Sequence, residues 1–189
     1  TVQGRGKGVP VGVRLSAGTL DLRGATFGSG GRSGGAQGGP IRLSLDRLQI
    51  TEGIALTDFR GEFDGQGGFS GEFAGQLNGG PALIGRIVPQ NGRSAIRIQS
   101  ADAGGVAAAA GLIKTATSGS LDLTLLPAAG AGEFDGDLRI RDLRINDAPA
   151  MASLLDAISV AGLLRQLDGQ GIAFDEVDAK FRLSPTQVI

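Results

Sequence analysis

The feature that most constrains this chain is a pair of short alternating segments that occurs twice. Residues 43–50 read LSLDRLQI and residues 138–145 read LRIRDLRI, which agree in polarity at every position. Each is followed by a second segment, 53–63 in the first copy and 171–181 in the second, and these two begin with Gly-Ile-Ala and end with Phe. Alternation with period two predicts strands that have one apolar face. We therefore expect one two-strand unit to occur twice in the fold.

Each of the four segments contains two consecutive polar residues, after which the apolar residues resume on the other parity. Two polar residues in a row inside an alternating strand indicate a β-bulge, which bends the strand and increases its twist. The expected bulges are at Asp46–Arg47, Thr57–Asp58, Arg141–Asp142 and Asp175–Glu176.

Two helical insertions are expected in this β-rich chain. The two strands of the second copy are separated by residues 146–170, where apolar residues fall at i, i+3, i+4 and i+7 and predict a helix over about 148–167. A shorter helix is expected over about 101–113, with Ser100 or Asp102 as its N-cap. We expect the apolar face of the longer helix to lie on the concave side of the sheet as a plug or lid.

The remaining segments predict about ten to twelve strands. Residues 9–27 alternate loosely, as a hairpin would, and residues 28–39 predict a flexible glycine-rich loop. The chain contains 34 glycines, many of them inside alternating segments, and frequent glycine together with bulges suits a strongly curved sheet. The predicted fold is mainly β, a curved antiparallel sheet that forms an open groove or half-barrel with two short helical insertions. The alternative is an ordinary sandwich or a closed barrel.

Composition and motifs argue against several classes of function. The chain has 189 residues, a net charge of −1, no His and no Cys, and no catalytic or phosphate-binding motif. Acidic pairs such as Asp135 with Asp137, and Asp175 with Asp178, lie on alternating segments, where a solvated face is expected. We therefore expect a protein that is not an enzyme, without cofactor, metal or nucleic-acid partner. We also expect the 1–189 segment to be a single piece of a larger protein, whose membrane anchor lies outside it.

Residues 94–184 resemble the C-terminal region of the AsmA-like family, which includes AsmA, TamB and YhdP. The resemblance is carried by IRIQSADAGGVAAAAGLIKTATSGSLDLTLL, then GEFDGDLRIRDLRINDAPAMASLLDAISVAGLL, then GQGIAFDEVDAKFRLS, in the order of the family's motifs. Residues 1–90 match only in style, as strands punctuated by glycine. The resemblance implies a periplasmic segment of an inner-membrane-anchored envelope protein of a Gram-negative bacterium, which carries phospholipid between the inner and outer membranes.

The expected ligand is therefore the acyl chains of phospholipid, bound along an apolar groove, with the protein a monomer. The alternative is an interaction or assembly module for outer-membrane protein biogenesis, in which a sheet edge pairs with a client strand. A closed core would show the same alternation as a groove. The expected lipid-binding residues are Leu43, Leu45, Ile54, Leu56, Leu121, Leu123, Leu125, Phe134, Leu138, Ile140, Met151, Leu154, Leu155, Ile158 and Phe174.

Overall fold

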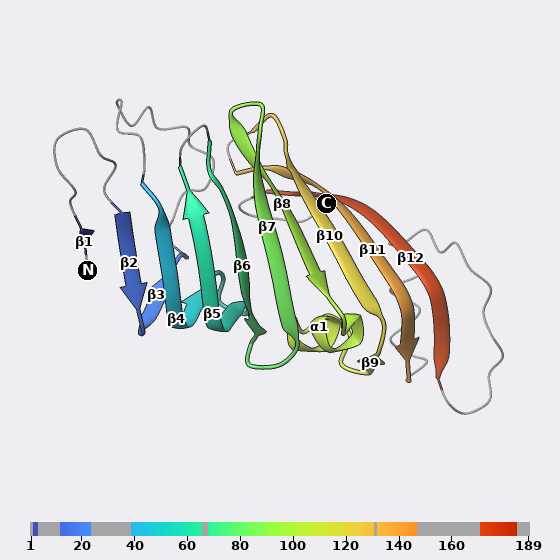
Figure 1. Ribbon diagram of the computed structural model, residues 1–189. Helices are drawn as coiled ribbons and strands as arrows, with labels where there is room; N and C mark the ends of the chain where they lie inside the picture. Colours follow the sequence, from blue (N-terminus) through green and yellow to red (C-terminus); the bar gives the residue numbers. More distant parts are fainter. Residues whose placement is uncertain are drawn as a thin grey trace.

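The described residues of the protein form a large open sheet of strands with one short helix (Figure 1). The computed structural model describes residues 2–3, 12–23, 39–65, 68–130, 132–146 and 171–184. The elements are β1 (Val2–Gln3), β2 (Gly12–Ser16), β3 (Thr19–Asp21), β4 (Ile41–Gln49), β5 (Ala55–Asp64), β6 (Ser70–Leu77), β7 (Ala82–Gln90), β8 (Arg93–Ser100), α1 (Ala103–Ala109), β9 (Ala116–Thr117), β10 (Ser120–Pro127), β11 (Phe134–Ile145) and β12 (Ile172–Leu183).

Within the described residues, the strands form a single 12-stranded sheet in the order β1-β2-β4-β5-β6-β7-β8-β10-β11-β12, with β3 beside β4 and β9 beside β11. From β4 to β12 every neighbouring pair on this path is antiparallel. The path does not return to its start, so the sheet has two edges rather than a closed barrel. The predicted mainly β class and the number of strands are confirmed.

The sheet is mixed rather than antiparallel throughout, and the hairpin predicted for residues 9–27 is wrong. β2 and β3 do not pair with each other; both run parallel to β4, in line along it. Ala17 (φ 71°) and Gly18 (φ 96°) break the chain between them in the left-handed region. The Gly18 N–H donates to Asp46 Oδ2 at 2.8 Å, so the break is held against β4 and the chain continues instead of reversing.

The repeated two-strand unit is confirmed as β4–β5 and β11–β12. Leu45 pairs with Phe59 and Leu48 with Leu56 in the first copy. The equivalent pairs of the second copy join Ile140 to Val177 and Leu143 to Phe174. Although residues 146–171 separate β11 from β12 in the sequence, the two strands pair directly, as β4 and β5 do.

All four strands change face at the predicted positions. The residues on either side of each polar pair, such as Leu45 and Leu48, are buried in the same apolar cluster. Asp58 (φ 49°) and Asp142 (φ 57°) adopt the left-handed backbone at the change, a conformation that Asp tolerates better than most residues. Both strands of a unit change face together, so their mutual register is kept. Between β5 and β6, where only β5 changes, the register shifts after Thr57.

Helix α1 lies at the end of the sheet where β8 ends and β6 turns into β7 (Figure 1). Asp102 is its N-cap, because Asp102 Oδ1 accepts from the Gly105 N–H at 2.8 Å. The helix is shorter than the predicted 101–113. Apart from Gly39, the predicted loop over 28–39 lies outside the described residues, and so does the predicted helix over 148–167.

Asn78 ties α1 to two turns of the sheet. Its Nδ2 donates to the carbonyl oxygens of Gly53 and Ala109, both at 2.8 Å, and its Oδ1 accepts from the Ala55 N–H at 2.9 Å. One side chain thereby joins the β4–β5 turn, the β6–β7 turn and the end of α1.

Candidate functional site

The site predicted from the sequence is an apolar face of the sheet, and cross-strand registers show that this face is continuous. Two neighbouring rows cross nine strands, from β2 to β12, and contain only apolar residues and glycine. We call them together the apolar track. One row is Leu15, Leu43, Gly61, Phe73, Gly85, Ile98, Leu123, Leu138 and Ala179, and the other is Val13, Ile41, Phe63, Gly71, Ile87, Ile96, Leu125, Gly136 and Phe181.

The apolar track runs across the strands, along the length of the sheet. Neighbouring strands lie about 4.8 Å apart, so a row that crosses nine strands is about 40 Å long. Along most of the track, the side chains are half-buried rather than sealed, including Phe73, Ile98, Leu123 and Leu138.

The glycines of the apolar track lie beneath phenylalanine rings. A Cβ on Gly85 would lie 2.0 Å from Cζ of Phe73 on the next strand, and one on Gly136 would lie 2.4 Å from Cζ of Phe181. Such pairs keep the ring flat on the neighbouring glycine, which compensates for the missing side chain. The glycines inside strands therefore leave space for aromatic rings on this face.

Two apolar clusters lie beside the track on the side of α1, the second of which shares Phe63 with the track, and α1 contacts both. The first cluster is built on β10–β12 and includes Ala103 and Ala107 of α1. The second is built on β4–β7, and Val106, Ala109 and Ala110 pack against it. The helix therefore covers the end of the apolar face near which β8 ends.

The structure places the predicted lipid-binding residues as follows. The first cluster holds Leu121, Ile140 and Phe174 with Leu123 and Leu138 packed against it, and the second holds Leu45 and Leu56 with Leu43 and Ile54 packed against it. Leu125 is buried, and Phe134 is half-buried at the start of β11; neither belongs to a cluster. Met151, Leu154, Leu155 and Ile158 lie outside the described residues.

The opposite face of the sheet carries a belt of ion pairs. Going from β4 to β12, one charged residue on each strand except β9 pairs with a neighbour: Arg42 with Glu62 at 3.4 Å, Arg86 with Glu72 at 3.2 Å, Arg97 with Asp122, and Arg139 with Asp178 at 2.9 Å. Glu62 stands opposite Glu72, and Arg86 opposite Arg97. The charge of each of these residues is nevertheless balanced, because each forms an ion pair with a residue of opposite charge on the strand at its other side.

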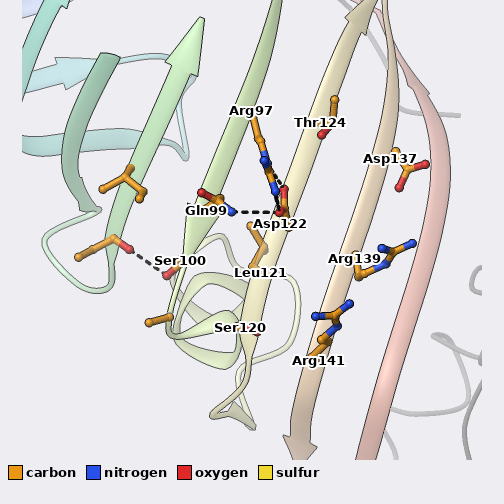
Figure 2. Close-up of a pocket in the computed structure, with 13 residues that line it drawn as sticks. Arg97, Gln99, Ser100, Ser120, Leu121, Asp122, Thr124, Asp137, Arg139 and Arg141 are labelled. Carbon is orange, nitrogen blue, oxygen red and sulfur yellow. Dashed lines mark hydrogen bonds and ion pairs between the residues drawn. The ribbon is translucent and has the colours of Figure 1, made fainter.

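Asp122 is the most densely bonded acid of the belt. Figure 2 shows Arg97 and Gln99 of β8 converging on it, with Arg97 Nε donating to Oδ1 at 2.9 Å and Gln99 Nε2 to Oδ2 at 3.0 Å. The Arg97 hydrogen bonds, followed by those of Gln99 and the charges of Arg97 and Arg139, hold the pKa of Asp122 below its ordinary value, although partial burial opposes this. The carboxylate is therefore stabilised in its ionised form.

A hollow on the charged face was not expected from the sequence. It has a volume of about 980 Å³ and lies over β7, β8, β10 and β11, where Arg139, Arg141 and Asp137 line it beside Asp122 (Figure 2). A second hollow of about 580 Å³ adjoins it over β5–β8. Every charged residue that lines the larger hollow belongs to an ion pair. Its charges are therefore balanced by their neighbours.

Of the acidic residues singled out in the sequence, Asp135, Asp137 and Asp175 are exposed as predicted, whereas Asp178 is half-buried and paired with Arg139. Asp135 pairs with Arg182 at 2.8 Å and Asp137 with Lys180 at 3.8 Å, and the side chains of both acids are about half exposed. Among the described residues, no group of three His, Cys, Asp or Glu side chains could hold a metal ion. The described part of the chain contains no helix that is long and apolar enough to span a membrane.

Comparison with known proteins does not assign the chain to a family: no family model, no curated protein and no solved structure matches it. The site is therefore interpreted from its own geometry.

Proposed function

We propose that this chain is a segment of a bridge-like lipid-transfer protein that binds phospholipid acyl chains along the apolar track. The proposal places it in the periplasm, as part of an envelope protein anchored in the inner membrane, where lipid moves between the inner and outer membranes. It takes its setting from the resemblance of residues 94–184 to the AsmA-like family and its binding surface from the sheet.

The observation that carries the proposal is the apolar track itself. An apolar strip about 40 Å long is longer than the extended tail of an ordinary phospholipid, and it runs perpendicular to the strands, so a lipid can move along it without leaving apolar contact. Transfer of hydrocarbon from water to such a surface is favourable by about 25 cal/mol per Å² of apolar area buried. The opposite face carries the ion-pair belt, so the two faces of the sheet differ in polarity, with the apolar track on one and paired charges on the other.

The curvature that a groove needs also has a basis in this structure. Residues with a left-handed backbone lie within two strands, at Asp58 of β5 and Asp142 of β11. Others separate β2 from β3, at Ala17–Gly18, and β9 from β10, at Ser118–Gly119. Breaks of this kind turn the strands and increase sheet twist. In our proposal they curl the sheet around the apolar track to form an open groove, and α1 covers one end of it.

The alternative function, an assembly module that pairs with client strands, is supported by the edge of β12. In the described part of the chain β12 pairs only with β11, whereas its counterpart β5 has neighbours on both sides. A client strand would leave the apolar track unused. Lipid binding by the isolated protein therefore separates the two functions.

The test compares the same substitution on the two faces of one strand. Leu123 is half-buried in the apolar track, and Leu126, on the same strand, is 40% exposed on the charged face. Leu123→Asp should remove lipid that co-purifies with the protein, as measured by mass spectrometry, and reduce photo-crosslinking to an acyl-chain probe at least tenfold. Leu126→Asp should retain both.

Ile140 is a poor position for this test because only 8% of it is exposed within the first cluster, so an acid there would unfold the sheet. Circular dichroism of both Leu variants checks that they are folded. If folded Leu123→Asp protein retains as much lipid as the Leu126→Asp control, the track is not the binding surface.

A further inference from the structure

The edge strand β12 carries a charge pattern that is complementary to itself. On the charged face its residues are Glu176, Asp178, Lys180 and Arg182 in that order, so an acidic half is followed by a basic half. Ala179 lies at the centre of the pattern. In an antiparallel pair of identical strands centred on Ala179, Asp178 faces Lys180 of the second copy, and Glu176 faces its Arg182.

We propose that two copies of this chain associate through β12, edge to edge and antiparallel about a two-fold axis at Ala179. The sheet would then continue from one copy into the other without a break. This differs from the monomer expected from the sequence, and it does not depend on lipid binding.

The charges favour this register over its neighbours. Faces of a strand alternate, so the register can move only in steps of two residues if the apolar faces are to stay together. A step in one direction places Lys180 opposite Lys180 of the second copy, and a step in the other places Asp178 opposite its Asp178. Like charges directly opposite each other destabilise an antiparallel pair. Only the register centred on Ala179 pairs all four residues with opposite charges.

The neighbouring strands extend the match. Within one copy Asp178 pairs with Arg139 and Lys180 with Asp137, while Arg182 pairs with Asp135. Joining the two copies produces a row of strictly alternating sign, in which Arg139 and Asp178 of one copy are followed by Lys180 and Asp137 of the second copy. The contact between the two β12 strands, here called the joint, therefore has no like-charged neighbours. Within one copy the sheet has two such pairs, Glu62 beside Glu72 and Arg86 beside Arg97.

The apolar face is also compatible with the joint. Val177 of one copy would face Phe181 of the second copy, with the two Ala179 side chains between these contacts. Val177 is 1% exposed and so is already covered within its own copy, whereas Phe181 is half-buried and has apolar surface left to bury at the joint. The apolar tracks of the two copies would meet at Ala179.

The first experiment mixes two variants of the full 1–189 chain, with oligomeric mass measured by sedimentation equilibrium and native mass spectrometry. The unmodified protein should show twice the 19.1 kDa chain mass. Asp178→Lys and Lys180→Glu should each be monomeric, because each places two like-charged pairs at its own joint. An equimolar mixture should recover the dimer as a 1:1 heterodimer, in which every pair is again of opposite charge.

Mixing leaves the contacts within each chain unchanged, so recovery reports on the joint alone and not on folding. A monomer of the unmodified protein at 100 μM, on the order of a weak complex's dissociation constant, would overturn the proposal. So would a mixture that stays monomeric, or single variants that still dimerise. If the unmodified protein is monomeric, we would infer that another strand of the same chain pairs with the free edge of β12.

A second experiment tests the register. The chain has no cysteine, so Ala179→Cys introduces a single thiol that faces its own copy across the two-fold axis. Cα atoms of directly opposed residues lie about 4.5–5.5 Å apart, within the range that a disulfide spans. Oxidation should convert most of this variant to a covalent dimer. The matched control, Ala173→Cys on the same strand, places the thiols about 40 Å apart and should not crosslink; equal crosslinking of the two variants would refute the register.

Discussion

Replacement of Gly104 by alanine sets helix propensity against packing, and the two predict opposite signs. Gly104 lies in the first turn of α1, where alanine is favoured over glycine by about 1 kcal/mol on propensity alone. A Cβ at this position, however, would lie 2.3 Å from Cα and C of Thr117 and 2.4 Å from its N. These are backbone atoms of β9, so no side-chain rotation can relieve the overlap.

The helix would have to move about 1 Å away from β9 to restore an ordinary contact. Two hydrogen bonds hold it there: Ala103 N–H donates to Gly119 O and Gly104 N–H to Ser118 O, each at 2.8 Å. Overpacking costs about 1–3 kcal/mol, and each weakened hydrogen bond about 0.5–1.5 kcal/mol. After the gain of about 1 kcal/mol in propensity, the expected destabilisation is about 1–5 kcal/mol.

Urea denaturation followed by circular dichroism measures this change, and thermal denaturation should show a loss of about 2–4 °C in Tm per kcal/mol. The control is Gly53→Ala, because a Cβ on Gly53 meets no atom within 4 Å and its stability should change by no more than about 0.5 kcal/mol. If Gly104→Ala is as stable as the unmodified protein or more so, the close packing of α1 on β9 is wrong.

Two further predictions concern the anchoring of α1 and the ion-pair belt. Asn78→Ala should destabilise the protein by about 1.5–3 kcal/mol more than Asn91→Ala in urea denaturation, because both residues have φ 50° in an Asn-Gly turn but only Asn78 joins three elements through its side chain; equal losses would contradict this. Because the folded-state pKa of Asp122 is lowered, its contribution to stability is present above the ordinary pKa of 3.8 and is lost as the pH falls through the folded value. Thermal denaturation from pH 7 to pH 2 should therefore show the stability gap between the unmodified protein and Asp122→Asn closing below pH 4, and a gap that stays constant would exclude this role.

The sequence by itself determined which residues share a face and where the strands change face. Alternation is a local property: successive side chains of a strand point to opposite sides, and a second polar residue in a row marks the point where the parity changes. The positions at Asp46–Arg47, Thr57–Asp58, Arg141–Asp142 and Asp175–Glu176 could therefore be read without coordinates. So could the repeat, a helix cap at Ser100 or Asp102, and the apolar character of Leu45, Leu56, Ile140 and Phe174; the structure selects Asp102 as the cap.

Outside the two repeated units, only the tertiary structure decided which strands are neighbours, and it decided the register throughout. Pairing joins residues far apart in the chain, and the parallel alignment of β2 and β3 on β4 depends on the break at Ala17–Gly18 and its bond to Asp46. Register also decides that Phe73 covers Gly85, that the apolar residues form uninterrupted rows, and that the charges of the opposite face alternate toward β12. The alternating pattern specifies the two faces of each strand, whereas the order of the strands depends on hydrogen bonds that the pattern does not encode.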